Sequence, residues 1–440
     1  MRKLIVAGTI ILLWACQSST EYKTFLHQPQ RYSQTVHELN TVVMGNNFPP
    51  MVASRNYAYA AIAGYEVVAA AYPNQYQSLG GQLRGLDKVN SLALTPEVDV
   101  ELAALLAYMK VGEAVTFPEG SLGEYRDSIL KTAREKGLSS QVEKASQAFA
   151  DSIGREIIRW SKKDNYLQTR GAEKYTVKQE PGRWVPTPPM YATAVEPHWA
   201  SIRPMVIDSA SAFDPPAPPP FNMTDKKSEY YTNVMAIKNA IDSLTPEQKH
   251  MAEFWDDNPF KMNVTGHVMY GSKKFSPPGH WMSVVGIAAQ KANADFATTV
   301  YATAKTAIAL FDGFIQCWYV KYKYNTARPE TVINQYIDMN WRPYLQTPAF
   351  PEYTCGHSTI SSAAAEALTS VFGDNFAYTD STELEFGIPN RSFKSFRHAA
   401  DENNWARFYG GLHFHNSCVV STRMGQDIGK TIADKLKMKK

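Results

Sequence analysis

A long apolar stretch from Phe296 to Asn325 restricts the fold more than any other part of the sequence. It contains no proline and a single glycine, Gly313, so little in it would break a helix. No alternation of apolar and polar residues, as in a half-buried strand, is sustained in this stretch or elsewhere. Ala- and Leu-rich stretches at residues 51–71 and 98–109 also read as helices. We therefore expect an all-α protein whose helical bundles form two stacked layers, with residues 296–325 as a buried helix.

Prolines divide the chain. Eleven of the 26 prolines lie between Pro181 and Pro220, and each one fixes φ and removes a backbone donor. This composition predicts an irregular segment at residues 181–225 between an N-terminal helical region, 17–180, and a C-terminal catalytic helical bundle, 226–440. Trp184, Trp199 and Phe213 give the segment apolar anchors, so it need not be a flexible linker.

The first sixteen residues have the pattern of an export signal. Arg2 and Lys3 precede an apolar run, Leu4 to Ala15, that is too short to span a bilayer as a mature helix. The run ends in Leu-Trp-Ala-Cys, which resembles a bacterial lipobox with Cys16 as the lipidated residue, although Trp14 fits that pattern poorly. An ordinary cleaved signal peptide is the alternative. We expect an exported protein held to a bacterial membrane by a lipid anchor only, on the periplasmic or cell-surface side.

The net charge and the cysteine content limit the binding partners and the disulfides that this protein can have. A net charge of +3 on 440 residues is too small to suggest nucleic-acid binding. Export would place Cys317, Cys355 and Cys418 in an oxidising compartment, and three is an odd number, so at least one thiol stays free. Cys317 and Cys418 could form a disulfide or could be small buried residues on helices.

Helix signals continue along the C-terminal half. Thr245-Pro246-Glu247-Gln248 has the N-cap, first-turn proline and third-position glutamine of a helix start. A further helix is expected from about His357 to Phe372, where Gly373 would end it, and a last one over roughly residues 416–437.

Three short segments in the last 120 residues concentrate cationic and imidazole side chains near predicted helix ends. In the first, Lys321 and Arg328 are seven residues apart, which would place both on one face of a helix that Pro329 ends. Two cations on one face repel each other unless an anion lies between them.

The second segment, Phe350 to Ser358, leads directly into an Ala-rich helix. Free N–H groups at a helix start, with Gly356 permitting close approach, can hold an anion, and His357 could transfer protons there. In the third segment Arg407 and His413 are six residues apart and would point to different sides of an unbroken helix. Gly410-Gly411 between them supplies the necessary break.

Lys-x6-Arg-Pro, then Gly-His at a helix start, then Arg-x5-His together resemble the three-part signature of the vanadium-dependent haloperoxidase and type 2 phosphatidic acid phosphatase superfamily. The resemblance implies a C-terminal bundle of the vanadium haloperoxidase and acid phosphatase type. It also implies that three cations and one backbone N–H bind the oxygens of vanadate, while one histidine bonds to vanadium and one is the acid/base. The implied cations are Lys321, Arg328 and Arg407, the N–H is that of Gly356, and the histidines are His413 and His357.

Other stretches resemble the bacterial haloperoxidase branch. Trp318 and Phe350 match aromatic residues on the halide side of the site. Asp257 matches an acidic residue that pairs with the cations of the pocket in haloperoxidases. The alternative is that Asp257 is a plain surface residue. The implied activity is oxidation of iodide or bromide by hydrogen peroxide with vanadate as cofactor, whose site phosphate can also occupy. An acid or lipid phosphatase is the alternative. The sequence does not decide the halide, the organic acceptor or the oligomeric state.

Two positions depart from the family pattern. Cys355 replaces the usual serine before Gly-His, so a weak thiol donor stands where a hydroxyl is expected. A weakened oxyanion-binding relative is therefore a third possibility, and the thiol would be open to oxidation. Ser417 stands where phosphatases commonly carry an aspartate that orients the last histidine, which counts against phosphatase chemistry. His280 resembles the Gly-His motif but lacks a preceding cation pair, and we interpret it as a structural residue hydrogen-bonded near the pocket wall.

Overall fold

The computed structural model describes residues 20–440, apart from the side chains of residues 264 and 265. The expected signal segment with Cys16 lies outside the described residues, so export and lipidation stay predictions. Within the described part of the chain, no helix has both the length and the apolar character needed to cross a membrane.

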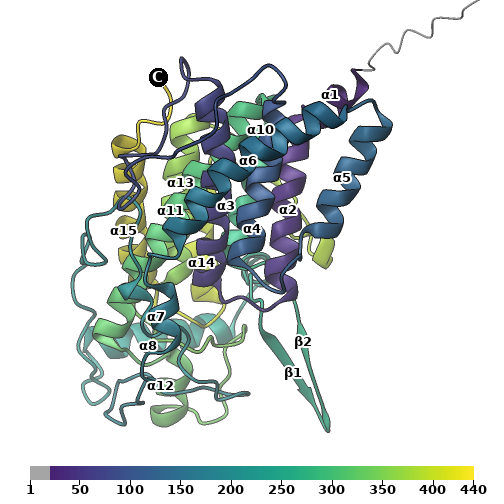
Figure 1. Cartoon of the computed structure of the whole chain (residues 1–440). Helices are drawn as coiled ribbons and strands as arrows, with labels where there is room; N and C mark the ends of the chain where they lie inside the picture. The colour runs from purple at the N-terminus through teal and green to yellow at the C-terminus, as the bar shows by residue number, and fades with distance from the viewer. Residues whose placement is uncertain (1–19) are drawn as a thin grey trace, which may run out of the picture.

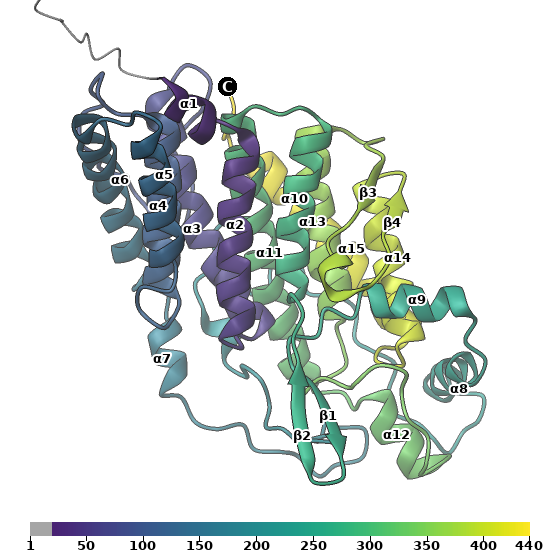
Figure 2. The same ribbon diagram turned by 90° about the vertical axis from the view of Figure 1, so that its right-hand side faces the viewer.

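The N-terminal part is helical, and its long helices run roughly parallel to one another (Figures 1 and 2). Its helices are α1 (Glu21–Leu26), α2 (Pro29–Gly45), α3 (Pro50–Ala71), α4 (Val100–Val115), α5 (Gly123–Glu135), α6 (Ser140–Ser161) and α7 (Tyr166–Arg170). Almost every residue of α3 is buried, so this helix lies inside the protein rather than on its surface.

The C-terminal part adds a second set of helices. They are α8 (Glu229–Asp242), α9 (Pro246–Phe254), α10 (Pro277–Lys291), α11 (Phe296–Tyr324), α12 (Pro329–Tyr336), α13 (Gly356–Phe372), α14 (Phe396–Tyr409) and α15 (His415–Lys435). Helices α10, α11, α13, α14 and α15 pack beside the N-terminal layer, whereas α8 and α12 lie below them (Figures 1 and 2). The predicted all-α class is confirmed.

Helix α11 joins the two layers. It packs against α3 on one side and α13 on another, and nearly all of its residues are buried. One continuous hydrophobic cluster includes Leu39 and Leu105 of the N-terminal layer together with Ile315, Ile360 and Ile428 of the C-terminal bundle. The expectation of a long buried helix over residues 296–325 is thus confirmed, and the helix belongs to both layers.

The proline-rich segment is fixed to the surface by its aromatic residues and by one buried carboxylate. Trp184 and Trp199 are fully buried, and Phe213 packs against the main core. Asp312 of α11 accepts hydrogen bonds from the backbone N–H groups of residues 205, 206 and 207 at 2.7 to 2.9 Å. These bonds satisfy backbone donors that an irregular buried segment cannot pair within itself.

Helix ends follow the local sequence signals. Thr245 and Gln248 form the expected capping box at the start of α9. Helix α13 begins at Gly356 with Cys355 as N-cap and ends before Gly373. Helix α15 covers His415–Lys435, close to the predicted last helix.

Two short antiparallel hairpins correct the expectation that strands are absent. Strands β1 (Lys261–Thr265) and β2 (Val268–Ser272) pair from Lys261 with Ser272 to Thr265 with Val268. Strands β3 (Tyr378–Asp380) and β4 (Arg391–Phe393) form the second pair. The β1–β2 hairpin projects away from the helices (Figure 2). Strands of three to five residues are too short for a period of two to be recognised in the sequence.

Candidate active site

The two cations of the first motif are brought together by a break in the chain rather than by a shared helix face. Helix α11 ends at Tyr324, and Asn325 adopts a left-handed conformation with φ 51°. Arg328 is the N-cap of α12, and Pro329 begins that helix. The expectation that Pro329 ends a helix containing both cations is wrong, because Asn325 ends it earlier and Pro329 at a first-turn position starts the next one.

Lys321 and Arg328 are both fully buried. The Lys321 ammonium donates to the carbonyl oxygens of Pro351 at 2.8 Å and Glu352 at 3.0 Å. Burial, with a contribution from the Arg328 charge, lowers the pKa of Lys321 to about 8. Burial likewise lowers the pKa of Arg328 to about 10. Both groups are therefore positive charges held out of water, which is costly unless an anion offsets them.

The third motif folds as its two glycines suggest. Helix α14 ends at Tyr409, and Gly411 has φ +80°, a conformation that favours glycine. Arg407 Nη1 donates to the carbonyl oxygens of Trp255 at 2.8 Å and Asp256 at 3.2 Å. Beyond the turn, the Nε2 atom of His413 lies 3.0 Å from Arg328 Nη1. The chain break thus carries His413 back to the cation of the first motif.

The Gly-His motif opens α13 beside these groups. A Cβ atom on Gly356 would lie 3.6 Å from the Trp318 ring, so the glycine leaves the backbone of the first turn open to close approach. His357 is partly buried. Burial, then the charge of Arg407, lowers its pKa well below the usual value, and the nearby His413 acts in the same direction. His357 is therefore neutral near pH 7, and an anion that offsets the Arg407 charge would raise its basicity.

Three nitrogen atoms at this centre are buried without a hydrogen-bond partner among the described residues. They are Arg328 Nη2, Arg407 Nε and His357 Nε2. An unpaired buried donor costs about 1 to 3 kcal/mol, and more when it is charged. Several cationic donors converging with a helix N-terminus fit a tetrahedral oxyanion, which accepts hydrogen bonds on every oxygen. The residues present therefore fit vanadate or phosphate.

Glu352 is a site residue that the sequence reading missed. Its Oε1 atom lies 3.0 Å from His413 Nδ1 and accepts from the Phe414 N–H at 3.2 Å. Its Oε2 atom accepts from the Ser417 hydroxyl at 3.1 Å. A carboxylate at Nδ1 places the proton there and leaves Nε2 facing Arg328. The expectation that Ser417 deprives His413 of a carboxylate partner is wrong, because Glu352 supplies one from the loop before α13.

The Cys355 thiol lies among polar groups rather than in hydrocarbon. Burial alone would raise its pKa, but a hydrogen bond with Cys418 and the proximity of His413 and His357 hold the pKa of Cys355 well below the usual value. Its backbone N–H donates to Ser421 Oγ at 2.8 Å. Cys317, Cys355 and Cys418 are all free and buried, so the structure contains the buried thiols and not the Cys317–Cys418 disulfide.

The two aromatic residues expected on the halide side lie against each other. The ring centroids of Trp318 and Phe350 are 5.0 Å apart. The Lys321 ammonium and the Arg328 guanidinium each lie 4.9 Å from the Phe350 ring centroid. Phe350 lines the cavity that leads to the centre, whereas Trp318 is almost fully buried behind it.

Asp257 has a different partner from the one expected. It is buried, and its Oδ1 atom lies 2.8 Å from His280 Nδ1. The neighbouring Asp256 is the carboxylate whose charge is close to Arg407. Burial raises the pKa of Asp256, and the Arg407 charge opposes that rise. Asp257 is thus neither a surface residue nor a partner of the three cations, because its side chain faces α10. His280 is buried and hydrogen-bonded, in agreement with its structural interpretation.

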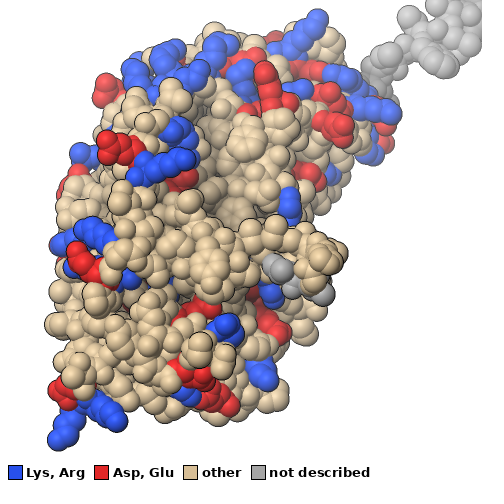
Figure 3. Space-filling view, turned by 90° about the horizontal axis from the view of Figure 1, so that it is seen from below, with Lys and Arg blue, Asp and Glu red and all other residues tan. Residues whose placement is uncertain are grey.

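A cavity of about 380 Å³ connects this centre with the outside. His357, Arg407, Asp256 and Phe350 line it, together with mostly apolar residues such as Met190 and Pro348. Seen from below, the molecule has wide areas without charged side chains (Figure 3).

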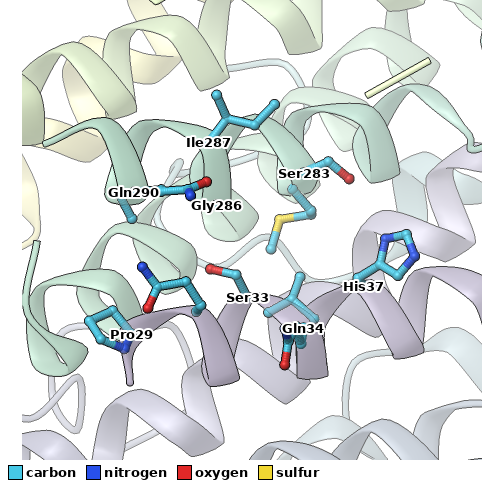
Figure 4. Close-up of a pocket in the computed structure, with 12 residues that line it drawn as sticks. Pro29, Ser33, Gln34, His37, Ser283, Gly286, Ile287 and Gln290 are labelled. Carbon is cyan, nitrogen blue, oxygen red and sulfur yellow. The ribbon is translucent and has the colours of Figure 1, made fainter. Parts of the chain in front are cut away.

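A second cavity, of about 360 Å³, lies between α2 and α10 (Figure 4). Polar, uncharged and apolar residues line it, among them Ser33, His37, Ser283 and Gln290. None of the candidate site residues lines this cavity, and no Lys, Arg, Asp or Glu is among its lining residues, so it lacks the buried cations of the first cavity.

The helical architecture and the cationic centre together define an oxyanion-binding helical-bundle protein, and comparisons with known proteins specify the family. Residues 301–439 match the model of the VCPO second helical-bundle domain. The chain shares 42% sequence identity with a bacterial vanadium-dependent iodoperoxidase of known crystal structure. The match covers 93% of this chain and 97% of that chain, with a TM-score of 0.88. The chain belongs to the vanadium-dependent haloperoxidase superfamily. No curated protein matches it.

More distant structures share the fold. The holo form of a bacterial vanadium-dependent chloroperoxidase is 18% identical, with 89% of this chain and 93% of that chain covered and a TM-score of 0.63. The apo form is also 18% identical, with 88% and 93% covered and a TM-score of 0.67. At this identity the likeness concerns the fold alone.

Proposed function

We propose that this protein is a vanadate-dependent haloperoxidase that oxidises iodide or bromide with hydrogen peroxide. The observation that carries the proposal is the pair of unpaired buried guanidinium donors on Arg328 and Arg407, with Arg328 against His413 Nε2 and Arg407 close to the unpaired Nε2 atom of His357. The 42% identity to a structure described as an iodoperoxidase supports the haloperoxidase class and makes iodide the first halide to test.

Each residue has a role that follows from its position. Lys321, Arg328, Arg407 and the Gly356 N–H would hold the oxygens of vanadate, and His413 Nε2 would bond to vanadium. Bound vanadate would supply a Lewis-acidic centre that activates hydrogen peroxide towards halide. His357, kept neutral by burial and by Arg407, would accept a proton at Nε2 as peroxide enters and return it to the departing oxygen. Phe350 and the apolar cavity wall would limit water around the reacting atoms.

Vanadate-dependent iodide oxidation tests this function. The protein is first freed of bound oxyanion, and triiodide formation is then followed as orthovanadate is added back in the presence of hydrogen peroxide. We expect activity to rise to saturation at one vanadate per chain and to fall when phosphate competes. His413→Ala should remain folded and inactive. Iodide oxidation at the same rate without vanadate would contradict the proposal.

A phosphatase on the same pocket is the second candidate, and Glu352 is the observation that favours it. A carboxylate at Nδ1 is the partner that a nucleophilic histidine needs, and Glu352 occupies that position at 3.0 Å from His413. Hydrolysis of p-nitrophenyl phosphate, inhibited by vanadate and accompanied by phosphate bound covalently to His413, would establish this activity. Tight vanadate binding with neither activity would instead indicate a weakened relative, as the thiol of Cys355 allows.

We also propose that the mature protein is exported and anchored through a lipid on Cys16. The support is the sequence of residues 1–16 alone. Labelling with a fatty acid in a bacterial host should be lost in Cys16→Ser, and that variant should move from the membrane fraction to the supernatant.

A further inference from the structure

A second group of buried ionisable side chains lies next to the cationic centre and has the opposite charge. It consists of Asp257 after α9, His280 on α10, Asp380 at the end of β3, and Glu383 just before a short 3-10 turn, Leu384–Phe386. All four are at most 1% exposed. Three carboxylates therefore surround one imidazole in a place that water does not reach.

The position of His280 is fixed from several sides. Its Nε2 atom lies 3.0 Å from Asp380 Oδ2. Its Nδ1 atom lies 2.8 Å from Asp257 Oδ1 and 3.8 Å from Glu383 Oε1. The ring stacks on Trp255 with centroids 4.7 Å apart. A carboxylate at Nε2 holds a proton on that nitrogen, and the second proton, on Nδ1 towards Asp257, is the one that a metal ion would displace.

Several carboxylate oxygens in this group lack hydrogen bonds. Asp257 Oδ2 and both oxygens of Glu383 are buried without a hydrogen-bond partner among the described residues. The Lys274 ammonium lies 3.3 Å from Glu383 Oε2. The three carboxylates of the cluster can carry three negative charges. Lys274 and protonated His280 supply two positive charges. One negative charge remains unbalanced, and an uncompensated buried charge is strongly destabilising.

This imbalance of charge can be removed in two ways. Either a proton on Glu383 or a cation between the carboxylates would restore neutrality. A divalent ion that replaces the Nδ1 proton of His280 leaves the three carboxylates ionised and balances them together with Lys274.

We propose that Asp257, His280 and Glu383 bind a divalent transition-metal ion, with Asp380 orienting His280 from the other side. The ligand atoms of these three residues all lie within 4.8 Å of one another. One imidazole nitrogen with two carboxylates suits Zn²⁺, Mn²⁺ or Co²⁺ better than Ca²⁺ or Mg²⁺, which prefer oxygen ligands alone. The carboxylate–histidine–metal arrangement is one that proteins use to fix a ligating imidazole.

This site is separate from the oxyanion-binding centre and does not depend on the proposed function. It is close enough to affect that centre, because Asp257 lines the same cavity as Arg407. Asp257 is the member of the cluster that lines this cavity, so an ion would enter past its side chain.

Metal binding to the full chain tests the site. The chelator-treated protein is titrated with Zn²⁺ by calorimetry and with Co²⁺ by visible absorption, without vanadate or peroxide. A partly exposed group, His27 with Asp99 and Glu101, could also bind a metal, so the titrations use the His27→Gln variant as background. We expect one equivalent to bind in this background, with a Co²⁺ spectrum of mixed nitrogen and oxygen ligation.

Glu383→Gln in the same background should weaken binding by about 100-fold, since it removes a charged ligand and keeps the shape. Glu385→Gln on the same turn is the matched control and should bind as the background does. Glu383→Gln should also melt no lower than the metal-free background, because it removes an unbalanced charge. No saturable binding in the background, or unchanged binding in a folded Glu383→Gln variant, would overturn the proposal.

Discussion

The two buried charged groups of this protein lie side by side and are opposites. Around His413 the unpaired atoms are guanidinium donors of Arg328 and Arg407 beside His357 Nε2, whereas around His280 they are carboxylate oxygens of Asp257 and Glu383. Each group has a histidine with a carboxylate on one ring nitrogen, Glu352 in one case and Asp380 in the other. The other ring nitrogen faces a cation near His413 and carboxylates near His280.

The contrast shows that burial alone does not identify a site's ligand. A protein interior tolerates unpaired charges only where something offsets them, and the sign of the unpaired atoms indicates what that is. Unpaired buried donors are stabilised by an anion, and unpaired buried acceptors are stabilised by a cation or a proton. Four experiments on the cationic group test whether its unpaired donors select an anion.

Arg328→Ala should have the largest effect. It removes a buried cation and a partner of His413, and loss of such a donor should lower kcat/KM for iodide oxidation by about 10³-fold or more. Vanadate binding, followed by calorimetry, should become undetectable. The exposed Arg423 on α15 provides the control, and Arg423→Ala should leave both values unchanged. Equal effects of the two variants would mean that the cationic group is not specific for the anion.

Glu352→Gln should have the next largest effect. The amide keeps the shape but no longer fixes the proton on His413 Nδ1, and changes of this kind at a ligating histidine typically cost 10- to 100-fold. We expect kcat to fall by about 30-fold and its pH profile to shift, with the fold retained by circular dichroism. Ser417→Ala removes only a hydroxyl donor to Glu352 and should cost less. A pH profile identical to that of the wild type would limit Glu352 to a packing role.

Anion affinity should fall as the pH rises through the Lys321 pKa. Lys321 is charged below about 8 and loses its proton above that value, so each further pH unit should weaken binding of the free protein by up to about tenfold. Sulfate is the suitable probe because its own charge is constant over this range. In Lys321→Met the alkaline decrease should disappear, and its persistence there would assign it to another group.

Cys355→Ser should have the smallest effect. A serine hydroxyl replaces a thiol whose lowered pKa makes it a poor donor, and a neutral hydrogen bond contributes about 1 kcal/mol, or about fivefold in vanadate affinity. The variant should also keep its activity longer in excess peroxide, because the thiol with the lowered pKa, which peroxide oxidises most readily, is removed. A large increase in turnover would instead show that the native protein is a weakened enzyme.

The sequence was most informative where spacing decides geometry. The Gly-Gly break between Arg407 and His413, the start of α13 at Gly356 and the buried α11 all follow from local signals. The sequence was least informative where contacts between distant segments determine the position of a side chain or the end of a helix. Asn325, not Pro329, ends α11, and Glu352 reaches His413 across 61 residues. Asp257 pairs with α10 because the turn after α9 directs its side chain there, which no local pattern indicates.

Helix α11 also determines which fragments of this protein can stand alone. Phe311 on its N-terminal-layer side contacts Tyr59 of α3 and Trp199 of the proline-rich segment. A shortened chain starting after that segment would retain every candidate catalytic side chain and yet expose an apolar helix face to water, at about 25 cal/mol per Å². Such a fragment should aggregate, and recombinant work on this enzyme family member should keep both layers or redesign that face with polar residues.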